Sequence, residues 1–152
     1  MYTLGPDTPA SADVQALLLR HFELMRASSP EESCHVLEPD MLLERDATLF
    51  VARDGETVLG VGAVAVIEPG HAELKSMHTA AEARGRGVGR AVLKALLDHA
   101  RDTGVTRVSL ETGSADMFAP AQALYVAHGF RNCPPFGSYV LDPLSVFMTR
   151  LL

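Results

Sequence analysis

The segment Glu82–Val92 constrains the fold more than any other, because its sequence EARGRGVGRAV has glycine at positions 85, 87 and 89. Glycine loses more conformational entropy on folding than other residues, so three glycines in one place indicate a need for bare or left-handed backbone. A strand-like stretch, Ala72–Thr79, precedes the segment, and apolar residues recur at helical spacing after it. The pattern predicts a strand, a glycine-rich turn and a helix, with several backbone N–H groups directed at one place.

Such a turn is suited to bind phosphate, because the unpaired N–H groups and the helix dipole both favour an anion. The loop of nucleoside triphosphatases, Gly-x-x-x-x-Gly-Lys-Ser/Thr, does not occur in the sequence. The dinucleotide fingerprint Gly-x-Gly-x-x-Gly is not met either, since the last spacing in Gly85-Arg86-Gly87-Val88-Gly89 is too short. What remains is the pattern Arg84-x-x-Gly87-x-Gly89.

Size and charge limit the classes of function. With 152 residues, 47% of them hydrophobic, the sequence is typical of a globular protein, and we expect residues 1–152 to form a single domain. The net charge of −6 argues against a nucleic-acid partner. Within residues 70–110, however, seven Lys or Arg stand against four Asp or Glu. This local positive charge favours a small anionic ligand.

Membrane, disulfide and metal signals are weak. No apolar run approaches the ~20 residues of a membrane helix, and the N-terminal residues lack the basic start and apolar core of a secretory signal. The two cysteines, Cys34 and Cys133, do not make a disulfide framework, and no ligand spacing suggests zinc. We therefore expect a cytoplasmic protein with free thiols, no metal and no membrane partner.

Apolar periodicity predicts a mixture of helices and strands. Helices are expected from Ser11 to before Ser28, over Pro39–Leu43, from about Gly87 to Thr103, and over Pro120–His128. Strands are expected over Thr48–Arg53, Thr57–Ile67, Ala72–Thr79, Arg107–Thr112 and Ser145–Leu151. In the first helix, Ser11 is the expected N-cap and the expected apolar face is Val14, Leu18, Phe22 and Met25. Gly60 and Gly62, inside the second strand, indicate a bulge or a close backbone approach.

Two motifs in this order resemble a known family. Arg84-x-x-Gly87-x-Gly89 is similar to the pyrophosphate-binding motif of the GCN5-related N-acetyltransferases (GNAT), Arg/Gln-x-x-Gly-x-Gly/Ala. The downstream sequence AQALYVAHGF (Ala121–Phe130) resembles their second motif, Ala-x-x-Leu-Tyr-x-x-x-Gly-Phe. The resemblance covers roughly residues 50–151. It implies an α/β fold with a mixed, mostly antiparallel central sheet flanked by helices and splayed at the central strand pair.

The resemblance also implies a reaction. It predicts an acetyl-CoA-dependent N-acetyltransferase that moves acetyl directly to a primary amine of a small molecule or a protein lysine, and homodimers occur in the family. A module that senses acyl-CoA without turnover is the alternative. Phe118 stands where relatives often carry an asparagine that contacts the donor, so that contact is not expected here. The implied donor-binding residues are Met77, His78, Thr79, Arg84, Gly85, Arg86, Gly87, Val88, Gly89 and Arg90.

Catalytic roles follow from matching positions. Tyr125 matches the tyrosine that protonates the departing thiolate, and an ordinary tyrosine pKa near 10 suits that role; simple packing on a short helix is the alternative. Glu73 precedes Arg84 by eleven residues, as does the base glutamate of histone-acetylating members. A solvent-facing strand position or a salt bridge to Lys75 is the alternative for Glu73, and Glu111 on the neighbouring strand is the second candidate base.

The sequence predicts the residues of the acceptor site less specifically than those of the donor site. The resemblance places His35 in the region that shapes this site, and the tail resembles small bacterial acetyltransferases in which Phe136 and Tyr139 would lie near the acceptor cleft. Glu111 is the fourth candidate for contact with the acceptor. Strand alternation is expected to put the following residues of the central strand on one face: Glu73, Lys75, Met77 and Thr79.

Overall fold

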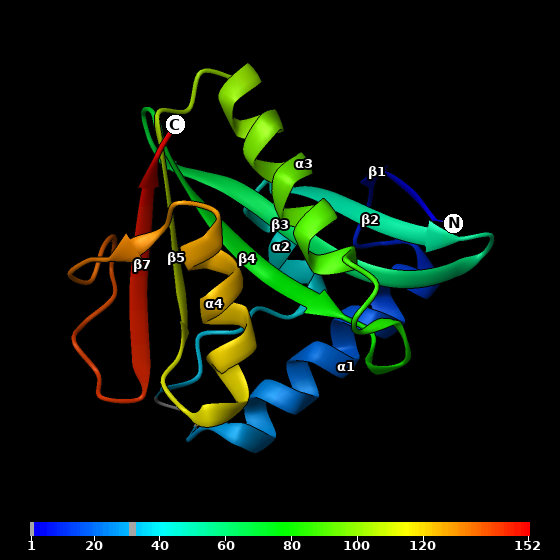
Figure 1. Ribbon diagram of the computed structural model, residues 1–152, viewed down its shortest axis with the longest axis horizontal. Coiled ribbons are helices and arrows are strands. Elements are labelled where there is room, and N and C mark those ends of the chain that lie inside the picture. The colour runs from blue at the N-terminus through cyan, green and yellow to red at the C-terminus, as the bar shows by residue number, and fades with distance from the viewer. Residues whose placement is uncertain (1, 31–32) are drawn as a thin grey trace.

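One seven-stranded sheet forms the centre of the molecule (Figure 1). The computed structural model describes residues 2–30 and 33–152. The strand order is β1-β2-β3-β4-β5-β7-β6, and every neighbouring pair is antiparallel except β4 and β5, which are parallel. This confirms the predicted mixed, mostly antiparallel sheet. The strands are β1 Thr3–Asp7, β2 Thr48–Asp54, β3 Thr57–Glu68, β4 His71–Thr79, β5 Arg107–Gly113, β6 Arg131–Asn132 and β7 Ser145–Leu151.

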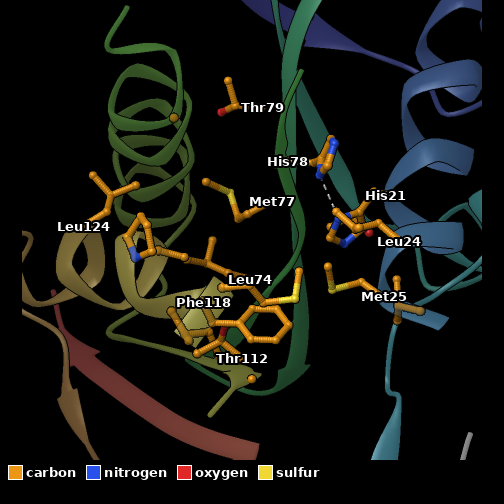
Figure 2. Close-up of a pocket in the computed structure, with 18 of the residues that line it drawn as sticks. His21, Leu24, Met25, Leu74, Met77, His78, Thr79, Thr112, Phe118 and Leu124 are labelled. Carbon is orange, nitrogen blue, oxygen red and sulfur yellow. Dashed lines mark hydrogen bonds between the residues drawn. The ribbon is translucent and has the colours of Figure 1, made fainter. Parts of the chain in front are cut away.

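The helices cover both faces of this sheet. Figure 2 shows α3 and α4 on one side of β4 and α1 on the other. The buried positions of α3 include the predicted Val88, Val92, Leu96 and Ala100, which pack against the sheet. The helices are α1 Ala12–Ser28, α2 Pro39–Glu44, α3 Val88–Asp102 and α4 Ala119–Ala127, with short 3-10 turns η2 Ala81–Ala83 and η3 Asp116–Phe118.

For α1 the predicted N-cap residue is confirmed, and the predicted apolar face is confirmed only in part. Ser11 stands at the N-cap position, but its side chain makes no capping hydrogen bond and instead donates to Asp7 Oδ1 at 2.9 Å. The buried face of α1 is rotated from the predicted one and includes His21, which faces β4. Phe22 and Met25 are therefore only partly buried. The buried residues of α1 are Val14, Leu17, Leu18 and His21.

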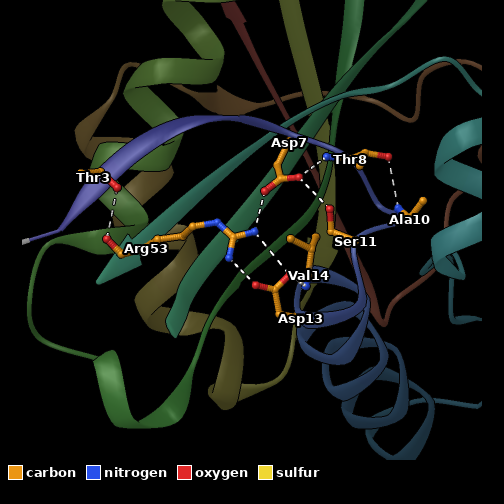
Figure 3. A network of polar contacts seen from close by, with 8 residues as sticks. All are labelled: Thr3, Asp7, Thr8, Ala10, Ser11, Asp13, Val14 and Arg53. Atoms are coloured by element: carbon orange, nitrogen blue, oxygen red, sulfur yellow. Dashed lines mark hydrogen bonds and ion pairs between the residues drawn. The ribbon is translucent and has the colours of Figure 1, made fainter. Parts of the chain in front are cut away.

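The edge strand β1 was not predicted, and neither was the two-residue strand β6. Strand β1 contains Gly5 and Pro6, which are poor strand formers but are tolerated at a sheet edge. An ion-pair network fixes β1 to its neighbours (Figure 3). Arg53 of β2 donates to Asp7 Oδ2 at 2.5 Å and also pairs with Asp13 in the first turn of α1. The guanidinium holds the pKa of both carboxyls below its ordinary value.

The two glycines of β3 lie where α3 crosses the sheet most closely. A Cβ on Gly62 would lie 2.8 Å from Leu96 Cδ1 and 2.9 Å from Val92 Cγ1, and it would also overlap Met77 Sδ. A Cβ on Gly60 would lie 2.6 Å from a methyl group of Val88. The predicted close approach is therefore confirmed, and the β3–β4 register also shifts opposite Gly62.

We expect Gly62→Ala to lower the melting temperature of the protein by roughly 3–10 °C, because overpacking of this kind costs about 1–3 kcal/mol. Gly5→Ala is the matched control, since a Cβ on Gly5 would meet nothing within 4 Å. Thermal unfolding followed by circular dichroism measures both variants. Equal melting temperatures for the two variants would contradict this account of the β3–α3 contact.

Candidate active site

A cavity of about 730 Å³ lies where β4 and β5 separate. The two strands pair only from His71 with Arg107 to Glu73 with Ser109, so their later residues are not joined by the ladder. This confirms the predicted splay of the central strand pair. Residues from both sides of the sheet line the cavity: α1 and residues 33–36 on one side, and the glycine loop and α4 on the other. The opening therefore connects the two faces of the sheet.

A bulge in β4 decides which residues face each side. Ser76 and Met77 together stand opposite Gly62, and Ser76 has a φ of 56°, which is rare for a residue with a side chain. Alternation is interrupted there, so the prediction that four β4 residues share one face was wrong. Figure 2 shows Met77 and Thr79 directed toward α3 and α4, and His78 toward α1. Glu73 and Lys75 lie on the α1 face.

The glycine loop has the backbone shape of an anion site. Gly85 and Gly87 have φ values of 80° and 77°, where only glycine is free of strain, and Gly87 is the N-cap of α3. A Cβ on Gly89 would lie 3.3 Å from Thr79 Oγ1, so this position also requires a small residue. The N–H groups at the start of α3 are thus directed toward the cavity edge, which Arg84 and Arg90 also line. A loop of this shape is suited to an anion.

Tyr125 lines the cavity on this same side of the sheet. Its ring is buried and packs edge-on against Phe130, with 5.8 Å between the ring centroids. Within the described part of the chain, its hydroxyl has no hydrogen-bond partner. Burial raises the pKa of Tyr125 above its ordinary value, so the phenol holds its proton at neutral pH. The side chain thus packs against Phe130 and also lines the cavity as a protonated phenol.

Glu73 is buried in a cluster of polar side chains on the opposite face. It is 3% exposed and does not line the cavity. Tyr139 donates to Glu73 Oε2 at 2.5 Å, and Lys75 Nζ lies 3.5 Å from the same oxygen. The salt bridge that the sequence analysis weighed against a catalytic role is therefore present. We call these three residues the Lys75–Glu73–Tyr139 cluster.

Glu111 does line the cavity. Burial raises the pKa of Glu111 to about 7, while the nearby Lys75 opposes that rise and the carboxyls of Glu73 and Asp142 add to it. A carboxyl that titrates near neutral pH can accept a proton from an ammonium group and is only partly ionised at rest. Of the two candidate bases, Glu111 has the access and the protonation behaviour that the role needs.

The other predicted acceptor residues divide into two groups. His35 lines the cavity and packs edge-on against Tyr139, with 5.0 Å between ring centroids. Phe136 and Tyr139 do not line it; both rings pack against Phe147 of β7, and Tyr139 belongs to the Lys75–Glu73–Tyr139 cluster.

A histidine pair in the cavity wall was missed by the sequence analysis. His21 Nδ1 and His78 Nδ1 are 3.1 Å apart, so α1 is joined to β4 by one hydrogen bond (Figure 2). Burial lowers the pKa of His21 to about 3 and that of His78 to about 4, so both rings are neutral. The spacing of His21 from Leu17 and Leu18 could have placed it on the buried stripe of α1. The side chain of His78 is thus occupied, and only its backbone faces the donor side.

Similarity to known proteins agrees with this geometry. Residues 13–130 match the acetyltransferase (GNAT) family. The chain belongs to this family. The resemblance inferred from the two motifs is confirmed, and with it the class of enzyme. In the described residues no helix is long and apolar enough to cross a bilayer, and no three His, Cys, Asp or Glu side chains converge as metal ligands would.

Relatives of this GNAT protein cover nearly its whole length. The uncharacterized N-acetyltransferase YedL of Escherichia coli K12 is 39% identical over 100% of this chain and 96% of its own. An IAA acetyltransferase of Azospirillum brasilense is 37% identical over 99% of this chain and 97% of its own. The solved structure of a Klebsiella pneumoniae protein assigned as an acyl-CoA N-acyltransferase has a TM-score of 0.80 and 29% identity, covering 100% and 98% of the two chains.

Proposed function

We propose that this GNAT protein transfers acetyl from acetyl-CoA directly to a primary amine. One observation carries the proposal: the cavity at the β4–β5 opening has an anion-binding loop and a phenol on one side and a carboxyl of near-neutral pKa on the other. Direct transfer needs the base and the acid on opposite sides of the thioester carbon, because the amine attacks from one side and the thiolate leaves from the other. The acceptor is an amine of a small molecule or a protein lysine.

The donor side binds through backbone. Residues 84–90 would hold the pyrophosphate by their N–H groups, with Arg84 and Arg90 adding positive charge. Met77, His78 and Thr79 would offer the exposed edge of β4 to the pantetheine arm, since that edge has no partner strand beyond Glu73. The bound molecule supplies an acetyl group activated as a thioester. The positive φ angles of Gly85 and Gly87 support this role, because they turn the loop into the N-cap of α3, whose first N–H groups have no partner within the helix.

The two proton transfers are then assigned to residues on different faces of the sheet. Glu111 accepts the proton that the amine must lose before or during its attack, directly or through water. Tyr125 donates a proton toward the departing sulfur and keeps that proton at rest because of its raised pKa. Glu73 is the less supported base, since its carboxyl is already bonded within the cluster and has no contact with the cavity.

We expect acetyl-CoA at about 100 times its Kd to raise the melting temperature by several degrees, because it binds only the folded state. Thermal unfolding with and without acetyl-CoA measures this. Thiol release with a panel of amines then tests transfer; polyamines, aryl and alkyl amines and a lysine peptide make up the panel. A thermal shift without turnover for any amine would favour the acyl-CoA sensor, and no shift at millimolar acetyl-CoA would contradict both.

A further inference from the structure

Lys75 is held in one place by three oxygen atoms from different parts of the chain. Its Nζ donates to the hydroxyl of Tyr139 at 2.9 Å and to the carbonyl of His35 at 3.0 Å, and it lies 3.5 Å from Glu73 Oε2. The Lys75 side chain is only 10% exposed. These contacts fix the position of the lysine's charge, whereas the ammonium group of an ordinary surface lysine moves freely. The fold thus holds one positive charge at a defined point.

That point lies across the strand opening from Glu111. In the parallel β4–β5 ladder, Glu73 stands beside Ser109. Lys75 and Glu111 lie two residues further along the two strands, and so on the same face of the sheet as Glu73 and Ser109. The ladder has ended there, so the space between these side chains is cavity, and both of them line it. Lys75 and Glu111 therefore occupy matching positions on the two strands, beyond the last ladder pair, and line one cavity.

We infer that Lys75 is a positioning residue whose fixed charge favours the ionised form of Glu111, the form that accepts the proton of the amine. The inference rests on the proposed function, because it concerns the base of that reaction. The proton passes from the amine to the Glu111 carboxylate, and Lys75 neither gives nor takes one. Glu73 and Tyr139 hold Lys75 in place, and the carboxylate of Glu73 partly offsets its effect.

The other charged and titratable groups around Glu111 are accounted for. Asp142, on the loop before β7, adds a negative charge that is half-buried and accepts a hydrogen bond from Ser33 at 2.6 Å. Tyr139 stays neutral because burial raises its pKa. His35 has a pKa lowered first by burial and then by Lys75, so it adds no positive charge at neutral pH. Among these groups, Lys75 is the cation that favours the ionised form of Glu111.

The test is the pH dependence of kcat/KM in charge variants. Lys75→Met should move the acid limb upward by on the order of one pH unit, so that activity falls several-fold at pH 7 and recovers near pH 9. Lys75→Arg should keep the wild-type limb, because it keeps the charge. Glu73→Gln should move the limb downward. Lys94→Met removes an exposed lysine of α3 that pairs with Asp98, and it should leave the limb unchanged.

A second measurement does not need turnover. The midpoint of the Glu111 carboxyl can be followed by NMR on protein labelled at the glutamate side-chain carboxyl, with the Glu111→Gln variant assigning the signal. If Lys75→Met fails to fold because Glu73 is left unpaired, Glu73→Gln is compared with the double variant Lys75→Met/Glu73→Gln. This pair isolates the charge of Lys75 in a background without an unpaired carboxylate, and the double variant should have the higher midpoint.

Opposite shifts for the lysine and glutamate changes support the inference, since a purely structural role would move neither midpoint. Unchanged midpoints, or shifts in the same direction, overturn it. The proposed function fails in a different way: wild-type protein would then show no turnover with any amine, or turnover with no acid limb near pH 7. The NMR midpoint would still report on Lys75 in that case.

Discussion

At pH 8, Glu111→Gln should lower kcat/KM by about 10²- to 10⁴-fold, because the amine loses the group that accepts its proton. Glutamine keeps the shape of the side chain and removes only its ability to take up a proton. The KM for acetyl-CoA should change little, since Glu111 lies on β5, away from the glycine loop. Steady-state kinetics of thiol release on purified wild-type and variant protein measure the effect.

The pH profile of the wild-type protein gives the same expectation from another side. The pKa of Glu111 is about 7, and a base must be deprotonated to act. The rate should therefore fall about tenfold for each pH unit below 7 and stay level above it. Glu111→Gln should lose this acid limb. A variant that retains both the limb and the wild-type rate would show that Glu111 is not the base.

Two controls separate catalysis from folding. The raised pKa means that the folded state binds the proton of Glu111 more tightly than the unfolded state does, so stability falls as the pH rises from the ordinary pKa of 4.5 to about 7, and the full cost of the ionised carboxyl remains at higher pH. Glu111→Gln removes that cost and should not lower the melting temperature at pH 8. Glu73→Gln is the matched variant on the neighbouring strand: it should keep most of the activity at pH 8 and keep an acid limb. Loss of that limb would make Glu73 the base instead.

Replacing Tyr125 with phenylalanine should lower kcat on the order of a hundredfold, because the departing thiolate then has no proton donor. The ring and its packing against Phe130 are kept, so the melting temperature and the affinity for acetyl-CoA should change little. Turnover kinetics and isothermal titration calorimetry measure these quantities. Since burial raises the pKa of Tyr125, the wild-type rate should show no loss up to about pH 9.

Tyr139→Phe provides the contrast on the other face of the sheet. There the lost hydroxyl leaves the buried Glu73 without its donor, so stability should fall by about 1–3 kcal/mol while Tyr125 still protonates the sulfur.

Comparable turnover of Tyr125→Phe and wild-type protein would remove the catalytic role of Tyr125 and leave it a packing residue.

The backbone of the proposed donor side could be predicted from sequence because its parts are contiguous. The glycines of residues 85–89 adopt left-handed or crowded backbone, and the residues around Tyr125 form one short helix that begins and ends within one position of the expected limits. Both signals come from local backbone preference, which acts over a few residues. Most strand and helix limits were predicted for the same reason.

The acceptor side could not be predicted in this way, because its geometry depends on one bulge and on distant contacts. Alternation places Glu73 and Met77 on one face, but the bulge at Ser76 separates them. Gly60 and Gly62 indicated a bulge or a close approach in β3, but no local signal marks the bulge in β4, which lies opposite Gly62 where α3 packs closely. Strand β1 was missed for a related reason: it is held by pairing with β2 and by the charge of Arg53, more than by its own β propensity.

From the sequence alone it follows that this chain is a GNAT acetyltransferase and which residues we propose for the pyrophosphate, since short motifs with fixed spacing carry that information. Tertiary structure decided which carboxyl faces the cavity. Tyr139 and Glu73 are 66 residues apart and still share a hydrogen bond, which keeps Glu73 within the cluster and leaves Glu111 in the cavity. A spacing pattern cannot show this, because burial and charge depend on neighbours that only folding brings together.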